Sequence, residues 1–123
     1  MKIEVSNGEI IDRLTILEIK LERIKDPDKL INISKEYEAI LPFAEQIIDL
    51  NNQLVKDLKT INISLWEIED RIRDLERNAD FGALFVQTAR QVYINNDDRA
   101  RIKKEINLLT NSGFTEEKSY KKY

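Results

Sequence analysis

The chain has 123 residues, of which 35% are charged and 41% hydrophobic, with a formal net charge of −3 and no cysteine or histidine. This length suits one domain with a single core. The missing residue types exclude disulfides, thiol chemistry, histidine bases and histidine-bound metals. The acidic balance argues against nucleic acid as a partner. No apolar run approaches the roughly 20 residues that span a bilayer, and the opening residues lack an apolar signal core, so we expect a cytoplasmic protein that does not enter a membrane.

The first helix is predicted over about residues 7–25. Residues 1–5 are expected to form an extended arm, and Ser6 with Glu9 forms the capping pattern S-x-x-E at the start of the helix. Apolar residues then recur at alternating spacings of four and three, which is typical of an amphipathic helix. These residues are Ile10, Leu14, Leu17, Leu21 and Ile24. Asp26-Pro27 is expected to end the helix.

Pro42 decides where the second helix ends. A helix that starts near Pro27 meets this proline, and proline inside a helix costs roughly 3 kcal/mol. The preferred interpretation ends the helix near Leu41 and starts a new one directly after Pro42, continuous over 43–78. One long helix kinked at Pro42 and a hairpin break at Asn51-Asn52 are the alternatives.

The most regular stretch runs through the middle of the chain. Its apolar residues alternate spacings of four and three without a break, which predicts an amphipathic helix docked against partner helices. They are Leu54, Leu58, Ile61, Leu65, Ile68, Ile72 and Leu75. Ile63 and Trp66 lie off this seam and form a second apolar stripe, which predicts a homodimer surface. The sequence NADFG over 78–82 is expected to end the helix in a turn.

A last helix is predicted over about 83–110, with a cap at 111–113. Residues 114–123 mix charges with aromatics and are expected to form a tail or a strap that docks on the chain. The fold predicted for residues 1–123 is therefore all-α. It is a single antiparallel bundle of about four helices, with long central and C-terminal helices and coiled-coil-like packing in a dimer.

Polar residues interrupt the seam of the last helix. Asn95 and Arg99 stand where apolar residues are expected, within the polar run 93–99. A buried arginine needs carboxylates, water or a ligand. One hypothesis is a site for an anion or a polar ligand formed by Asn95, Asn96, Asp97 and Arg99. The other is a buried polar layer that fixes register and oligomeric state.

Two other helices offer charges that could complete this site. Glu18 in the first helix, and Glu67 with Arg71 in the central one, recur at one-turn spacing on their helices. In an antiparallel bundle, Glu18 and Glu67 are candidate counter-charges for Arg99 and Lys103. The alternative is ion pairing along solvated helix faces, worth roughly 0.2–0.5 kcal/mol for each pair.

Two types of helical enzyme provide the catalytic alternative. The all-α nucleotide pyrophosphatase type holds Mg²⁺ with E-x-x-E and E-x-x-D, and only residues 67–70 match, to the second half. The helical chorismate mutase type clamps a dicarboxylate with several cations, and Arg71, Arg90 and Arg99 match it loosely. We therefore favour a role without catalysis, and expect no cofactor or metal except Mg²⁺ under the enzyme alternative.

Five sequence blocks, in order, resemble a family of small bacterial proteins known only as a domain of unknown function. The blocks are VSNGEIIDRLTILEIKLERIKDP, LWEIEDRIRDLE, NADFG, NDDRARIKKEIN and EEKSY. The resemblance extends over the chain except about residues 32–56. It implies a self-contained cytoplasmic bacterial protein, and no activity or catalytic residue. The resulting prediction is a binding module that acts as a homodimer on a protein partner or an anionic small molecule.

Overall fold

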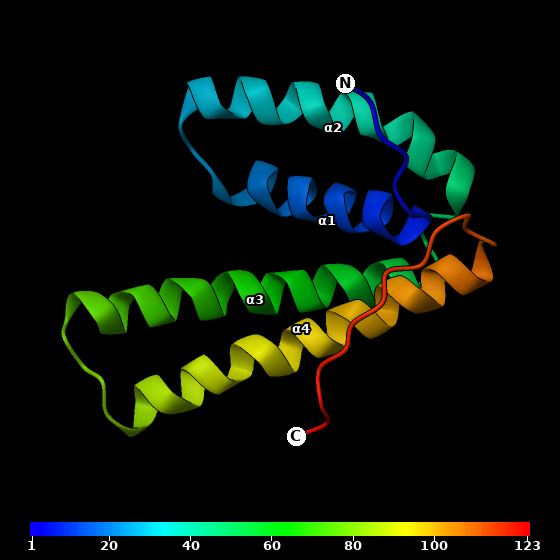
Figure 1. Cartoon of the computed structure of the whole chain (residues 1–123). Helices are drawn as coiled ribbons and strands as arrows, with labels where there is room; N and C mark the ends of the chain where they lie inside the picture. Colours follow the sequence, from blue (N-terminus) through cyan, green and yellow to red (C-terminus); the bar gives the residue numbers. More distant parts are fainter.

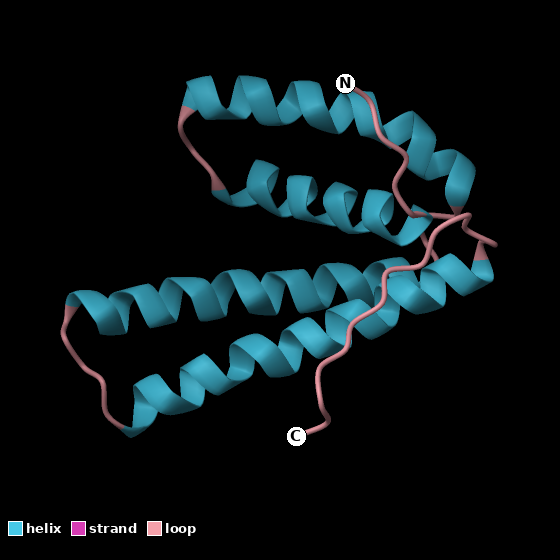
Figure 2. Ribbon diagram, viewed as in Figure 1, coloured by secondary structure: helices cyan, strands magenta, loops and turns pink.

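The computed structural model describes all 123 residues as four helices joined by turns, with no strand (Figures 1 and 2). The helices are α1 (Asn7–Arg23), α2 (Pro27–Ile47), α3 (Gln53–Arg77) and α4 (Ala83–Leu109). This architecture confirms the predicted all-α bundle. None of the four helices combines the length and the apolar character that crossing a membrane requires.

α1 is the helix around which the others are arranged. It contacts α2, α3 and α4, whereas α2 packs against α1 alone. Figure 1 shows α1 lying between α2 and the hairpin formed by α3 and α4. The side chains of Ile11, Leu14, Leu17 and Ile19 are each exposed by 1% or less, so α1 is covered on more than one side. The shortest helix, and not the longest seam, therefore forms the centre of the bundle.

Local side-chain caps fix three of the helix starts. Ser6 Oγ accepts from the Glu9 N–H at 3.2 Å and begins α1, as the capping pattern predicts. Asp26 Oδ1 accepts from the Asp28 N–H at 3.0 Å at the start of α2. Asn52 Oδ1 accepts from the Leu54 N–H at 2.9 Å and begins α3. These caps satisfy amide groups that would otherwise lack a partner at a helix start.

The preferred prediction of a helix break at Pro42 is wrong. α2 runs through Pro42 to Ile47, and the chain turns over residues 48–52 instead. Pro42 is exposed, so its ring meets solvent, and α2 bends toward its C-terminal end (Figure 1). The turn is held by Asp49, whose Oδ1 accepts from the Asn51 N–H at 2.9 Å and whose carbonyl accepts from the Asn52 N–H at 2.9 Å. The alternative break at Asn51-Asn52 is therefore the one that occurs.

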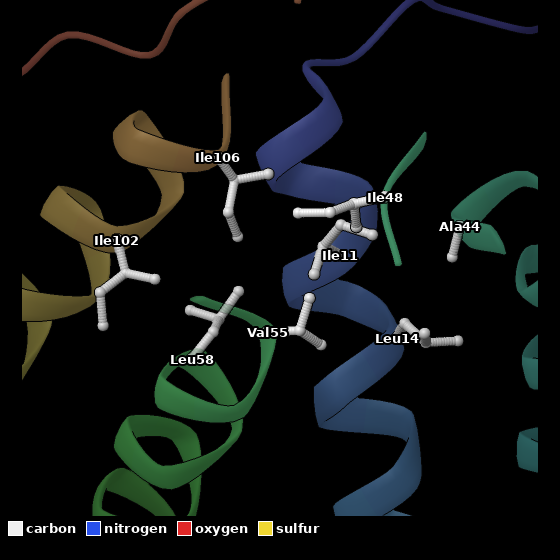
Figure 3. Packing of buried hydrophobic residues seen from close by; sticks show 8 residues of the cluster. All are labelled: Ile11, Leu14, Ala44, Ile48, Val55, Leu58, Ile102 and Ile106. Carbon is white, nitrogen blue, oxygen red and sulfur yellow. The ribbon is translucent and has the colours of Figure 1, made fainter. Parts of the chain in front are cut away.

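The apolar core lies at one end of the bundle. α1 and α3 begin there, and α2 and α4 end there, so all four helices contribute (Figure 3). The buried cluster consists of Ile11, Leu14, Ala44, Ile48, Val55, Leu58, Ile102 and Ile106. The opposite end, where α3 turns into α4, has no comparable cluster. The polar residues described next lie beside the core end.

Candidate functional site

One cluster of polar side chains is buried between α1, α3 and α4. Asp12 is 1% exposed and accepts two hydrogen bonds from Arg99, one from Nε to Oδ1 at 2.9 Å and one from Nη2 to Oδ2. Asn62 donates through Nδ2 to Asp12 Oδ1 and to Thr15 Oγ1, both at 2.9 Å. Thr15 Oγ1 donates to the main-chain carbonyl of Asp12 at 2.8 Å. A carboxylate on α1 is thus held by donors from two other helices.

Arg99 is the member of this cluster that reaches the surface. Its side chain is 29% exposed, whereas that of Asp12 is 1% exposed. A guanidinium has five N–H donors on three nitrogens, and the bonds to Asp12 use only Nε and Nη2. The hydrogen bond to Asp12 is the main cause that raises the pKa of Arg99, so the side chain stays charged. The guanidinium is therefore held in place on one edge and free to donate on another.

A groove of about 560 Å³ opens above Arg99, between α1 and α3. Arg99 and Asn62 belong to its lining, so the buried cluster and the groove share two residues. Four apolar side chains and four charged ones complete the lining. The apolar ones are Ile16, Ile19, Leu65 and Trp66, and the charged ones are Lys20, Glu69, Asp70 and Arg73. An apolar concavity with a few converging polar groups is the usual form of a small-molecule site.

A second charged cluster joins the start of α1 to α4 and the tail. The ammonium group of Lys103 donates to Glu9 Oε2 at 2.7 Å and to Glu116 Oε2 at 2.9 Å. Burial lowers the pKa of Lys103, but its hydrogen bonds to both carboxylates raise it, and the net shift is upward. The hydrogen bond from Lys103 lowers the pKa of Glu116. The tail therefore docks on α4, as expected for a strap.

The start of α1 lies directly against the end of α4. The Gly8 N–H donates to Asn107 Oδ1 at 2.6 Å, and the Asn7 N–H donates to Ser112 Oγ at 3.0 Å. A Cβ at position 8 would lie 2.5 Å from the carbonyl oxygen of Lys103. Glycine at this position therefore permits the close approach of the two helices that brings Asp12 to Arg99.

The residues predicted for the site do not all meet. Arg99 lies in the polar cluster, but Asn95 Nδ2 donates to the carbonyl of Gln91 on its own helix at 2.8 Å. Asn96 and Asp97 line a different cavity of about 450 Å³, formed with tail residues 118–123. Asn96 also borders a smaller cavity that contains Arg99.

The counter-charge of Arg99 is Asp12, and neither Glu18 nor Glu67 reaches it. Glu18 instead pairs with Lys59 of α3 at 3.1 Å, and Glu67 pairs with Arg23 at the end of α1 at 3.4 Å. Glu67 also lines the groove between α3 and α4, whereas Arg99 lines a separate groove. The Glu18–Lys59 and Glu67–Arg23 pairs each join α1 to α3, so they differ from the pairs along one helix face that the alternative interpretation predicts.

Arg71 lies apart from Arg99, in a groove between α3 and α4 of about 440 Å³. The cationic cluster of the chorismate mutase type therefore does not assemble around these two residues, because they line separate grooves. The structure also brings together no group of three or more acidic side chains that could hold a metal ion.

Sequence reasoning missed two residues that the site depends on, Asp12 and Asn62. Asp12 follows Ile11 and precedes Leu14, and all three are buried. Asn62 lies four residues after the buried Leu58 and is itself 6% exposed. The sequence signal for both is a polar residue on the buried face of a predicted helix, the same signal that indicates Arg99 in the last helix.

A family model matches residues 1–123, and its description is Family of unknown function (DUF6165). The chain therefore belongs to this family, in agreement with the resemblance of its sequence blocks. Comparisons with curated proteins and with solved structures gave no significant match.

Proposed function

We propose that this member of DUF6165 is a binding module without catalytic activity, and that its groove takes a small anionic ligand with an apolar part. We also propose that it acts as a homodimer in the bacterial cytoplasm, as its sequence patterns and family resemblance imply. Each part of the proposal has its own support and its own test.

One observation carries the ligand proposal: Arg99 is fixed by a buried carboxylate and still lines an open groove. A flexible arginine loses side-chain entropy when it binds an anion. Here Asp12 has already oriented the guanidinium, so that loss is reduced. The planar fork suits a carboxylate or a phosphate, which accept two parallel hydrogen bonds.

The rest of the groove supports a ligand with an apolar part. Trp66 and Leu65 from α3 face Ile16 and Ile19 from α1 across a space of about 560 Å³, which is within the range for small-molecule sites. Lys20 lies on the same lining and makes no ion pair within the chain. Its ammonium group is therefore available as a second cation in the groove.

The test uses Trp66, the only tryptophan of the chain, as a reporter inside the groove. A panel of anionic metabolites, nucleotides and sugar phosphates is titrated with and without Mg²⁺, following Trp66 fluorescence and the melting temperature. A ligand at 100 times its dissociation constant adds about 2.7 kcal/mol, which raises the melting temperature by several degrees.

Arg99→Lys separates the binding role of Arg99 from its structural role. Lysine keeps a positive charge beside Asp12 and loses the planar fork. We expect the affinity for a bound ligand to fall at least about tenfold while the helical circular dichroism is unchanged. Arg101→Lys is the matched control, because Arg101 lies on the same helix with an exposed side chain.

A panel without any hit, or a hit that Arg99→Lys leaves intact, would contradict the ligand proposal. Turnover of a hit would instead support the enzyme alternative.

The surface area of the chain supports the homodimer. A compact monomer of 14.5 kDa exposes about 6,900 Å², whereas this chain exposes 8708 Å². The arm and the tail contribute to this excess of about 1,800 Å². A standard protein interface buries about 800 Å² on each partner, which is less than half of the excess.

A further inference from the structure

The hairpin of α3 and α4 extends beyond the rest of the bundle. Arg23, the last residue of α1, pairs with Glu67 of α3 at 3.4 Å. α3 then continues for ten residues to Arg77, or about 15 Å. α2 does not contact either helix of this hairpin (Figure 1). Beyond Glu67, α1 is bordered only by the face of α3 that carries Glu69, Asp70 and Arg73, which line the groove with Lys20. We call residues 68–88 the overhang.

The overhang leaves large apolar side chains uncovered. Phe81, Leu84 and Val86 are 56%, 51% and 53% exposed. Phe85 packs edge-to-face on Phe81 with ring centroids 5.3 Å apart, and this contact leaves more than half of Phe81 in solvent. Two helices bury apolar side chains only along their line of contact. The remaining apolar surface of a two-helix projection therefore needs further helices to cover it.

We propose that a second copy of this chain covers the overhang. Two overhangs pack side by side about a two-fold axis and form an intermolecular four-helix bundle. The proposal rests on the homodimer proposed above and places its interface beyond the stripe of Ile63 and Trp66 that the sequence suggests, because Trp66 lines the groove. Each overhang supplies two amphipathic helices that lack partners, and a second copy supplies two more of the same kind.

The charges of the overhang permit this pairing. Its surface carries both signs, with Arg71, Arg73 and Arg77 among the acidic residues of α3. Arg73 and Arg77 pair within α3, with Glu69 and Asp74, whereas Arg71 makes no ion pair within the chain. A surface of one sign would repel its own copy, and this mixed surface does not.

Other exposed apolar residues are less suited to an interface. Ile31 and Phe43 of α2 are 66% and 63% exposed, but they lie twelve positions apart and stand singly. Leu108 and Leu109 lie at the core end, where the chain leaves α4 and the tail turns back along this helix (Figure 1). Single exposed apolar residues are ordinary, whereas Phe81, Leu84 and Val86 lie within six positions at the end of a two-helix projection.

The experiment is sedimentation equilibrium of the full chain over a range of concentrations. We expect the wild type to have twice the 14.5 kDa chain mass. We expect Leu84→Arg to raise the dimer dissociation constant at least about tenfold, because it places a charge in the interface. Ile31→Arg and Leu108→Arg are the matched controls, being exposed helical residues outside the overhang. We expect both to stay dimeric, and circular dichroism verifies the fold of each variant.

A second measurement covers the case in which Leu84→Arg does not fold. The chain has no cysteine, so Leu84→Cys and Ile31→Cys each introduce a single thiol. We expect a short bis-maleimide to cross-link the Leu84→Cys protein into dimers and to leave Ile31→Cys uncrosslinked.

The outcomes separate the two proposals. A monomeric wild type at every concentration would overturn the homodimer and its interface together. A dimer that survives Leu84→Arg and dissociates with Ile31→Arg or Leu108→Arg would overturn the interface alone. A dimer in which Ile31→Cys cross-links and Leu84→Cys does not would also overturn the interface. None of these results decides whether the groove binds a ligand, which the titration with Trp66 fluorescence tests.

Discussion

Asp12 on the first helix and Arg99 on the last, 87 positions apart in the sequence, form a two-point ion pair inside the bundle. Because Asn62 donates to the same carboxylate, this contact connects three helices at one point. It also orients the guanidinium of Arg99, which lines the groove. The same interaction thus has a structural consequence and a functional one, and the two can be measured separately.

Removing Arg99 should destabilise the protein much more than removing the charge of Asp12. Arg99→Ala leaves a carboxylate that is 1% exposed without its cation, which should cost about 3–5 kcal/mol. Asp12→Asn leaves an arginine that is 29% exposed and reached by water, so the loss should be smaller, about 1–3 kcal/mol. Urea unfolding followed by circular dichroism gives both values.

The double variant Asp12→Asn/Arg99→Ala completes the test of this ion pair. Without a charge at position 12, the loss of Arg99 no longer leaves a buried carboxylate unpaired. The double variant should therefore be more stable than Arg99→Ala alone. Strictly additive losses would show that the two side chains do not interact in the way the geometry indicates.

Gly8→Ala should destabilise the protein through crowding. The new Cβ would lie 2.5 Å from the Lys103 carbonyl oxygen, which is backbone and cannot rotate away. We expect a loss of about 1–3 kcal/mol, the usual cost of overpacking. Gly113→Ala is the matched control, because its Cβ would meet nothing within 4 Å. Equal urea midpoints for the two variants would mean that α1 and α4 do not approach closely at Gly8.

The docking of the tail should weaken at low pH. The hydrogen bond from Lys103 holds the pKa of Glu116 below its ordinary value of 4.5. A lowered pKa in the folded state stabilises docking above that ordinary value, and the stabilisation is lost as the pH falls through the lowered pKa. As the pH falls below 4.5 and through the lowered pKa, amide NMR relaxation should show residues 114–123 becoming mobile.

Two variants identify which carboxylate is responsible. Glu116→Gln should release the tail already at neutral pH, because the charge that faces Lys103 is gone. Glu117→Gln should have little effect, because Glu117 and Lys104 form a pair whose side chains are 71% and 49% exposed. A tail that is equally mobile in both variants would contradict the role of Glu116. The pKa of Lys103 is raised above 10.5, so its contribution is lost only as the pH rises beyond that value.

The sequence predicts helices better than it predicts their partners. Ser6 and the apolar spacing fix α1 because both signals are local, and the apolar spacing likewise predicts α4 and most of α3, but not where α3 begins. Pro42 misled the prediction because an exposed proline is tolerated when the helix bends, and the turn that follows depends on Asp49. The cost of proline inside a helix favours a break at Pro42, whereas the turn-forming Asp49 favours a break after residue 47. Sequence spacing alone could not decide between these two positions.

The site depends on contacts that sequence spacing does not contain. Polar residues in the seam of α4 correctly indicated that Arg99 needs a buried partner. Which carboxylate meets it depends on the rotation of α1 about its own axis, which the close approach at Gly8 helps to set. Glu18 and Glu67 have the right spacing on their helices and face other partners. The groove beside Trp66 likewise exists only after α1 and α3 have packed.

Ala79→Gly should stabilise the protein. Ala79 follows α3 with φ of 51°, a left-handed conformation that glycine adopts without the clash of a Cβ. The turn is fixed there by hydrogen bonds from the Ala79 N–H to the Glu76 carbonyl at 3.0 Å and from the Asp80 N–H to the Leu75 carbonyl at 2.9 Å, which is the glycine-favouring pattern at helix ends. We expect a gain of about 1 kcal/mol in urea unfolding.

Ala39→Gly, in the exposed interior of α2, is the control for Ala79→Gly and should have the opposite sign. Glycine there gains backbone freedom only in the unfolded state, so it should cost about 1 kcal/mol. The same substitution thus distinguishes a strained residue at a helix end from an ordinary helical one. If both variants were destabilised equally, the left-handed conformation at Ala79 would carry no strain, and the turn between α3 and α4 would have to differ from the one described.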